Sequence, residues 1–204
     1  MVDTSAAMVL AGARVGQVVN VSGSTDVLGL CAGAAVPHER LLTRALGVGK
    51  RWMSVGTIAA AGSSLQWARR ELFSDFTEPR FWKLVKRQSQ NRDSKSEISD
   101  IKFEPYLAGE RAAMEQRTGA FHGLTLAASR NQMLAAIIDG LARASAERIG
   151  LLRSVGRLGR DVMVSGGAGK VGDVMRRDWP GNWRFRYEEQ ATLRGLGLLV
   201  PRGR

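Results

Sequence analysis

Three short segments of this chain carry the side chains and turns that can do chemistry. Asp3 is a carboxylate at the expected start of a helix, where it can cap the backbone or act as a general base. The turn Gly23-Ser24-Thr25 offers two hydroxyls and backbone N–H groups, which together can hold a phosphate. The glycine-rich turn 166–169 follows an apolar stretch, so its backbone can approach a nucleotide closely. Each segment also has a purely structural interpretation, as a helix cap, a β-turn and a packing turn.

Other familiar sites are not predicted. Lys170 is followed by Val171 instead of Ser or Thr, so the glycine-rich turn is not a phosphate-binding P-loop. His38 and His122 are far apart in the sequence, and no Cys or carboxylate spacing accompanies them. We therefore expect no metal site built from protein side chains.

Alternating strands and helices must position these segments. The β-branched run 17–21 and the apolar run 27–31 predict a hairpin around the hydroxyl-bearing turn. Helices are expected from Ala6 to Ala13, 63–73, 129–150, 170–178 and 188–199, with strands at 161–165 and 183–187. This alternation predicts an α/β fold. We expect one domain over residues 1–204, with a polar loop or connector around 88–102.

Bulk composition narrows the class of protein. Apolar residues make up 44% of the 204 residues, as expected for a globular chain, and no run approaches the roughly 20 apolar residues of a membrane helix. The single cysteine, Cys31, suits a reducing compartment, so a cytoplasmic protein is expected. The net charge of +11 permits a nucleic-acid-binding protein. The charges are dispersed, however, and this favours a solvated surface.

One block is more specific than any of these features. It consists of Gly119-Ala120-Phe121-His122-Gly123-Leu124, followed after seven residues by Gln132-Met133 and the apolar run to Asp139. The block resembles a signature of the FGGY carbohydrate kinases. Segments resembling other parts of that family occur in the family's order: 2–7, 19–26, 62–67, 105–111, 165–168 and 189–199.

The resemblance implies a fold, a reaction and a set of site residues. The fold would be a ribonuclease H-like α/β domain of the actin, hexokinase and sugar-kinase type, as a single C-terminal lobe. ATP and Mg²⁺ would be the cofactors, and a sugar or polyol hydroxyl would be the acceptor. Asp3 would be the catalytic base. The residues implied in ATP binding are Ser24, Thr25, Gly62, Gln66, Gly166, Gly167 and Ala168.

Family members are about twice as long as this chain, and their N-terminal lobe carries the first phosphate loop and most sugar contacts. We therefore expect a lobe that has little activity alone. Three versions stay open: a truncated gene product, half of a split enzyme that assembles with a separate N-terminal lobe, and a retired kinase that serves as a nucleotide-binding module. A homo-oligomer is the other way to cover an exposed inter-lobe face. The alternative from another class is the basic nucleic-acid-binding protein.

Overall fold

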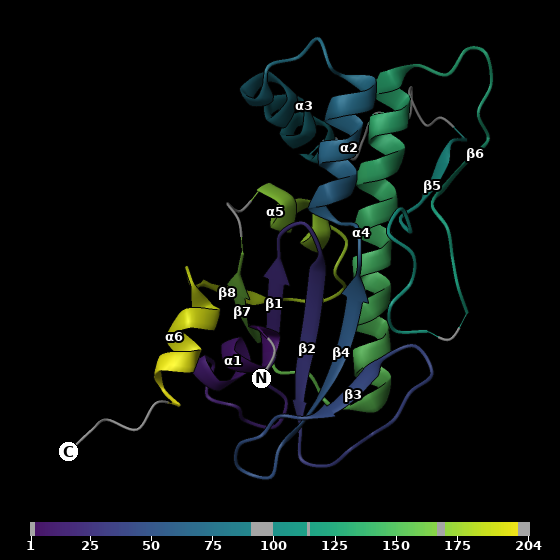
Figure 1. Cartoon of the computed structure of the whole chain (residues 1–204). Coiled ribbons are helices and arrows are strands. Elements are labelled where there is room, and N and C mark those ends of the chain that lie inside the picture. Colours follow the sequence, from purple (N-terminus) through teal and green to yellow (C-terminus); the bar gives the residue numbers. More distant parts are fainter. Residues whose placement is uncertain (1–2, 91–99, 114, 167–169, 200–204) are drawn as a thin grey trace.

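A six-stranded mixed sheet forms the centre of the protein in a computed structural model that describes residues 3–90, 100–113, 115–166 and 170–199. Its strands are β1 (Val18–Ser22), β2 (Asp26–Ala32), β3 (Leu42–Ala45), β4 (Trp52–Ile58), β7 (Asp161–Ser165) and β8 (Arg184–Tyr187). Their order is β3-β4-β2-β1-β7-β8 (Figure 1). Strands β1 and β2 form an antiparallel hairpin, whereas β7 runs parallel to β1 and β8 runs parallel to β7.

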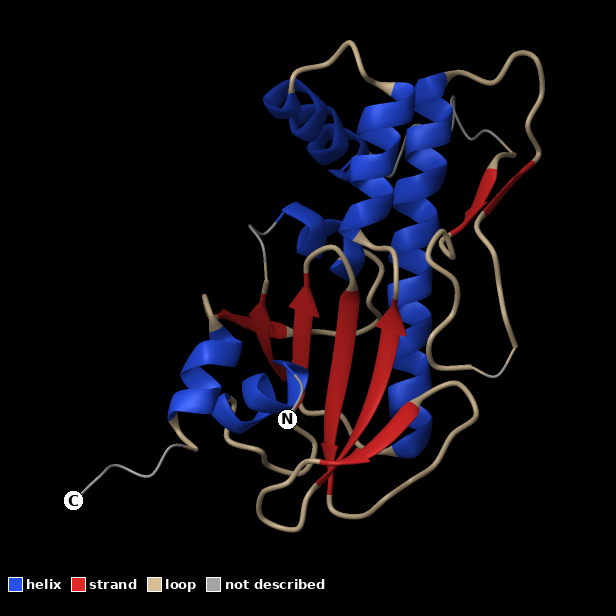
Figure 2. Ribbon diagram, viewed as in Figure 1, coloured by secondary structure: helices blue, strands red, loops and turns tan. Residues whose placement is uncertain are grey.

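The helices are α1 (Asp3–Leu10), α2 (Gly62–Leu72), α3 (Glu78–Gln90), α4 (Arg130–Val155), α5 (Lys170–Arg176) and α6 (Ala191–Gly197). Helices α1 and α6 pair on one face of the sheet, and the lower half of α4 covers the other (Figure 2). The upper half of α4 extends beyond the sheet, where it packs with α2, α3, and a separate two-stranded ribbon made of β5 (Lys102–Glu104) and β6 (Ala120–His122).

Strand alternation explains why both faces of the sheet are covered. Along β1, Val18 packs in the core under α4, and its neighbour Val19 packs in the core under α1 and α6. Along β7, Val162 and Val164 face α4, and Met163 faces the opposite core. Because successive side chains in a strand point to opposite faces, a strand in which adjacent residues are both apolar must have both faces covered.

Helix α4 joins the sheet to the helical layer above it. It has 26 residues, which is a length of roughly 39 Å. Its first turn is closed by a capping box, in which the Ser129 side chain accepts from the Gln132 N–H and the Gln132 side chain accepts from the Ser129 N–H. Along its upper half, Leu134, Ile137 and Leu141 are buried in the core shared with α2 and α3.

Several expected elements differ from the structure. Helix α1 already begins at Asp3, and α3 was not expected at all, so residues 88–90 are helical and do not belong to a connector. In α3 only Phe81, Leu84 and Val85 are buried, and this narrow stripe is hidden among charged side chains in the sequence. Strands β3, β4, β5 and β6 were also not expected. In the described ranges, no helix combines the length and hydropathy that crossing a membrane requires.

Candidate functional site

The tip of the β1–β2 hairpin carries a group of free hydrogen-bond donors. The turn spans residues 23–25 and is closed by a bond from the Gly23 N–H to the Thr25 carbonyl oxygen, 2.8 Å long. Among the described residues, none accepts from the backbone N–H or the hydroxyl of Ser24 or Thr25. Ser24 is exposed, and a Cβ placed on Gly23 would meet nothing within 4 Å. The turn therefore presents backbone and side-chain donors to open space.

The start of α2 holds this turn in place. The Gly62 N–H donates to the Gly23 carbonyl oxygen over 3.0 Å, and the Ala61 and Ser63 N–H groups donate to the Ser24 carbonyl oxygen over 2.9 and 3.2 Å. A Cβ on Gly62 would overlap the Gly23 carbonyl oxygen and lie 3.1 Å from Val171 Cγ2. Only glycine fits between the hairpin tip and the first turn of α5. The hydroxyl-bearing turn and Gly62, which the sequence predicted to share a site, thus lie together.

The glycine-rich turn after β7 approaches the same hairpin from the other side. Gly166 has φ +110°, and a Cβ there would overlap the Ser22 carbonyl oxygen. Glycine is therefore required at this position by the packing of two backbone segments. Gly167 and Ala168, the other two residues expected in this turn, lie outside the described residues.

The glycine-rich turn also fits a spacing that belongs to another fold. Residues 167, 169 and 172 are glycines in a Gly-x-Gly-x-x-Gly pattern, which is typical of dinucleotide-binding proteins. That pattern functions in a parallel strand–helix–strand unit at the start of a doubly wound sheet. Strand β7, helix α5 and strand β8 form such a parallel unit, but it lies at the edge of a mixed sheet in which β7 also pairs with β1 of an antiparallel hairpin. The doubly wound sheet that the dinucleotide interpretation requires is therefore not present in the described structure.

A cleft of about 750 Å³ opens beside the Gly166 turn, between the ends of β1, β7 and β8 and the first turn of α6. Its lining includes Ser22, Gly166, Arg176, Tyr187 and Thr192. The side chain of Arg176 is only 6% exposed. Its guanidinium donates to Asn20 Oδ1 over 2.9 Å and to the Tyr187 hydroxyl over 3.4 Å. The cleft therefore has a buried cation at its base, which pairs with Asp173 over 3.4 Å, and its lining also includes Glu188 and Glu189.

Asp3 does not line this cleft but contacts a residue that does. It is the first residue of α1 and is exposed. Its backbone carbonyl oxygen accepts from the Thr192 hydroxyl over 3.3 Å, and Thr192 lines the cleft. An acidic side chain in the first turn of a helix is favoured by the helix dipole.

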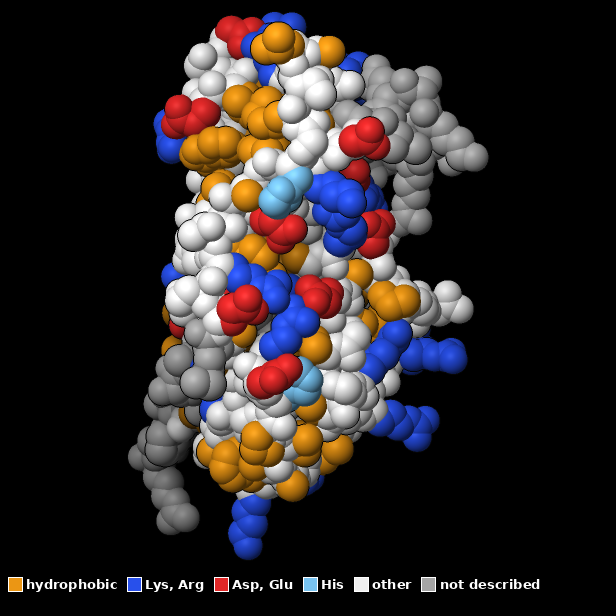
Figure 3. All heavy atoms as spheres, turned by 90° about the vertical axis from the view of Figure 1, so that its right-hand side faces the viewer, with side chains coloured by type: hydrophobic (Ala, Val, Ile, Leu, Met, Phe, Trp, Pro, Cys, Tyr) orange, Lys and Arg blue, Asp and Glu red, His pale blue; other side chains and the backbone are white. Residues whose placement is uncertain are grey.

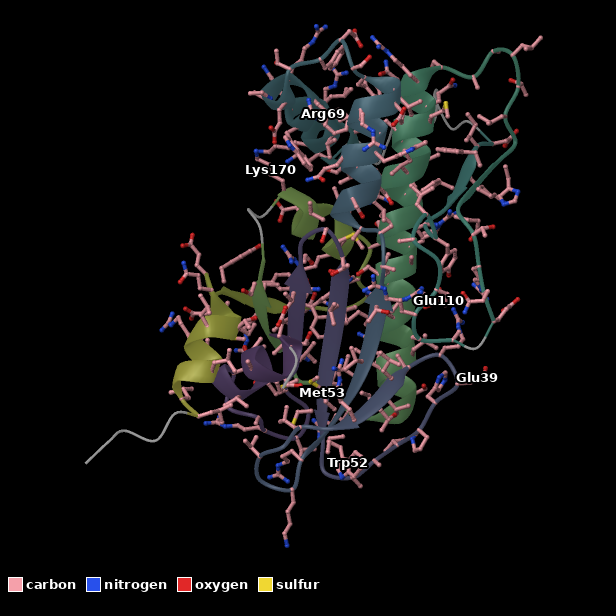
Figure 4. All side chains as sticks on the ribbon, viewed as in Figure 1. Glu39, Trp52, Met53, Arg69, Glu110 and Lys170 are labelled. Atoms are coloured by element: carbon pink, nitrogen blue, oxygen red, sulfur yellow. The ribbon has the colours of Figure 1, made fainter. Side chains whose placement is uncertain are left out.

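Gln66 lies one turn beyond Gly62 on α2 and faces a second hollow of about 510 Å³, together with Arg69 and Trp82. The Lys170 ammonium is 5.6 Å from the centre of the Trp82 ring, which connects α3 to the start of α5. In Figure 4 the labelled Arg69 and Lys170 lie on the same side of the molecule. Of the predicted site residues, Gly166 lines the cleft and Gln66 lines this hollow, whereas Ser24 and Gly62 meet at the hairpin tip.

The side chains that could bind a metal ion are scattered over the described structure. Within residues 3–90, 100–113, 115–166 and 170–199, no group of three or more His, Cys, Asp or Glu side chains is arranged to hold a metal ion. His38 and His122 are on different elements: His38 forms an isolated bridge with Leu41, and His122 ends β6. A Mg²⁺ ion commonly keeps several waters and binds phosphate oxygens, so it does not need such a cage.

Charges on the face that carries α4 and the β5–β6 ribbon are mixed. Figure 3 shows positive and negative side chains interleaved along the middle of this face. The ion pairs between Arg40 and Glu147, at 2.7 Å, and between Arg117 and Glu115, at 3.3 Å, are examples of such neighbours. A continuous basic surface of the kind that tracks a nucleic-acid backbone is not seen on this face.

Two residues near the site were not predicted from the sequence. Arg176 at the base of the cleft is one of many basic residues, and composition alone does not single it out. Asp26 closes the hairpin opposite Ser22 and is buried, but in the sequence it looks like part of a polar turn. Of the two, only Asp26 could have been found from the sequence, because it directly precedes the apolar run 27–31, which was expected to be a strand.

Comparisons of the sequence and of the structure with known proteins indicate the same group of enzymes. Residues 18–177 match the model of the C-terminal domain of the FGGY family of carbohydrate kinases. Similar solved structures include a xylulose kinase from Rhodospirillum rubrum (21% identity, TM-score 0.74, 93% of this chain and 38% of that one) and a ligand-bound xylulose kinase from Lactobacillus acidophilus (21%, 0.70, 95% and 41%). A Plasmodium falciparum glycerol kinase with ADP is also similar (17%, 0.74, 97% and 40%). The chain thus spans about two-fifths of their length. A search of curated proteins found no match.

Proposed function

Because the chain belongs to the FGGY family of carbohydrate kinases, as its C-terminal domain, we propose that it is the nucleotide-binding lobe for ATP-dependent phosphorylation of a sugar or polyol hydroxyl. In this proposal Ser24, Thr25, Gly62, Gln66, Gly166, Gly167 and Ala168 bind ATP, and Asp3 is the general base. The observation that carries it is the hairpin tip, where the N–H groups and hydroxyls of Ser24, which is exposed, and Thr25, which is half-buried, have no acceptor among the described residues.

The free donors fit the chemistry of a nucleotide phosphate. Charge-assisted bonds from N–H and O–H groups to phosphate oxygens are among the stronger hydrogen bonds in proteins. Ser24 and Thr25 supply both kinds, and the bonds from α2 to the Ser24 carbonyl oxygen prevent the turn from rotating away. The chain's part in binding is therefore to hold the phosphates in a fixed direction, and Mg²⁺ would neutralise their charge when bound.

Asp3 supports the acceptor half of the reaction. Its carbonyl oxygen accepts from the hydroxyl of the cleft residue Thr192, so its backbone is anchored although its side chain is exposed. A carboxylate there can accept the proton of a substrate hydroxyl that enters the cleft. Arg176 at the base of the same cleft can attract an anionic donor, in competition with its present partner Asp173.

We also infer that transfer needs a second lobe. The outer side of α6 and the residues after it expose four leucines: Leu193 (65%), Leu196 (40%), Leu198 (61%) and Leu199 (37%). An apolar group of this kind on one element is typical of an interface. A complementary kinase lobe is the occupant we propose, because the relatives of similar fold are about two and a half times as long as this chain. A second copy of the chain is the competing occupant.

Thermal unfolding tests nucleotide binding. Mg-ATP at about 100 times its Kd should stabilise the chain by roughly 2.7 kcal/mol, and so raise Tm by about 5 to 10 °C. Removing both hydroxyls, by Ser24→Ala with Thr25→Ala, should reduce that shift. A matched control removes two other exposed threonine hydroxyls, by Thr118→Ala with Thr125→Ala. A wild-type chain whose Tm is unchanged by Mg-ATP contradicts the proposal.

The second lobe is tested by mass and by turnover. Leu193→Lys with Leu198→Lys should abolish association with an added N-terminal kinase lobe, measured by light scattering, and should abolish phosphoryl transfer by the mixture. If the wild-type chain is instead a dimer that these changes dissociate, a second copy is the occupant. If the chain binds ATP but no mixture transfers phosphate to a sugar or polyol, the remaining interpretation is a nucleotide-binding module without kinase activity.

A further inference from the structure

A carboxylate is buried at the base of the hairpin that carries the phosphate-binding turn. Asp26 is the first residue of β2, lies directly opposite Ser22, and is 1% exposed. Its Oδ1 accepts from Asn20 Nδ2 over 2.8 Å and from the Ser22 hydroxyl, and its Oδ2 accepts from the Ser145 hydroxyl over 3.2 Å. All three neighbours donate, so the Asp26 carboxylate is the acceptor in each of these hydrogen bonds.

The hydrogen bonds continue from Asp26 into the rest of the protein. Ser145 belongs to α4, and its hydroxyl accepts from Trp179 Nε1 over 2.9 Å. On the other side, Asn20 Oδ1 accepts from the Arg176 guanidinium at the base of the cleft. The base of the hairpin is therefore tied to α4, to the end of α5 and to the segment that leads into β8.

A buried polar network is energetically unfavourable at a position that an apolar residue could occupy. Leu28 and Leu30, which follow Asp26 on the same face of β2, are buried against α4 without polar partners. Burying a carboxylate is unfavourable unless its partners are well placed, and apolar replacements of buried polar groups are often neutral or stabilising. What a satisfied polar network adds is one defined arrangement of its members.

We propose that Asp26 is a positioning residue for the nucleotide phosphates: it fixes the base of the hairpin, so that the N–H groups of Ser24 and Thr25 keep one direction. The inference rests on the proposed function of that turn. Asp26 does not touch the nucleotide. It acts through Ser22, one residue before the turn, and through its own backbone, one residue after it.

Two substitutions at this position separate shape from hydrogen bonding. In Asp26→Asn the amide oxygen still accepts from Asn20 and Ser22, and the amide nitrogen faces the Ser145 oxygen, which can accept. Asp26→Val suits a strand but accepts nothing. Calorimetric titration with Mg-ATP should show that Asp26→Val weakens Kd by roughly tenfold or more, and that Asp26→Asn stays within about threefold of wild type. An Asp26→Val protein that binds as wild type overturns the proposal.

A nearby control removes a polar group that has no such role. Thr57 lies on β4 opposite Val27, and its Oγ1 is buried without a partner in the described structure. Thr57→Val should leave Kd unchanged. An equal loss of affinity in Thr57→Val would show that any disturbance of this sheet weakens binding, and would refute a special role for Asp26.

A change remote from the hairpin covers the case in which Asp26→Val does not fold. Ser145→Ala removes one donor from α4, and should weaken Kd and speed amide exchange in residues 20–27 relative to α3. If the wild-type chain binds no nucleotide, the proposed function fails, and exchange then tests only whether Asp26 fixes the hairpin. Exchange at 20–27 should match wild type in Asp26→Asn; unchanged exchange in Ser145→Ala, and in Asp26→Val if it folds, would overturn that role.

Discussion

Replacing Gly62 by alanine tests how the candidate site is assembled. A Cβ at this position would overlap the Gly23 carbonyl oxygen and would lie 3.1 Å from both the Gly23 carbonyl carbon and Val171 Cγ2. Two of these three neighbours are backbone atoms of the hairpin tip, which cannot rotate away as a side-chain end can. The tip must therefore move away from α2 by about 1 Å to restore normal carbon–carbon separations.

The cost follows from that displacement. Overpacking of this size costs about 1 to 3 kcal/mol. The bonds from the Gly62 N–H to Gly23 and from the Ala61 N–H to Ser24 would be stretched beyond hydrogen-bonding range, at about 1 kcal/mol each. Alanine recovers up to about 1 kcal/mol as a better helix former. We expect a net loss of about 2 to 4 kcal/mol, and hence a Tm lower by about 5 to 15 °C.

Urea unfolding monitored by circular dichroism measures this loss, and a second glycine provides the control. Gly150 lies inside α4, where a Cβ would meet nothing within 4 Å, so Gly150→Ala should stabilise the protein by up to about 1 kcal/mol. Opposite signs for the two Gly→Ala changes are expected. If Gly62→Ala is as stable as wild type and keeps the Mg-ATP shift in Tm, the hairpin tip is not held by α2 as described.

Three further outcomes concern stability. Glu110→Ala should cost about 1.5 to 3 kcal/mol in urea unfolding, because Arg148 loses its buried partner at 3.2 Å and keeps only the more exposed Glu147 at 3.1 Å. Ser129→Ala should cost about 1 kcal/mol by removing the cap of α4. Burial raises the pKa of Asp26 above 3.8, so its contribution to stability is full below the unfolded-state pKa and is lost as pH rises through the folded-state pKa. The urea midpoint of wild type relative to Asp26→Asn should fall over that window; a constant difference would contradict it.

The strands and helices that follow apolar periodicity were predictable. Strand 161–165 was expected and found at the same bounds, and the hairpin and α4 were found within a few residues of the expected ranges. The α/β fold follows from these elements. Strand β4 escaped prediction because its run contains Gly56, which looks like a break. In the structure Gly56 is needed where the stem of Arg148 crosses the strand, since a Cβ would lie 2.7 Å from Arg148 Cγ.

The candidate site was predictable only in part. Ser24, Gly62 and Gly166 could be brought together from the sequence because the resemblance to a family fixed their register. Arg176 could not be found in this way, because its importance lies in burial, and burial of a cation depends on Tyr187 and Asn20 from distant strands. Asp26 likewise requires Ser145, which is 119 residues away. Contacts between distant segments decide these roles, and no local pattern encodes them.

The structure changes the meaning of the glycines in the site. In the sequence, glycine turns suggest a backbone that a nucleotide can approach. In the structure, the space beside Gly62 and Gly166 is filled by carbonyl groups of the hairpin, at Gly23 and Ser22. These glycines therefore act on the protein itself, by letting α2 and the end of β7 close on the hairpin from both sides. The donors of Ser24 and Thr25 have no acceptor in the part of the chain that the structure describes, so affinity for a phosphate should follow the rigidity of this hairpin more closely than the number of glycines around it.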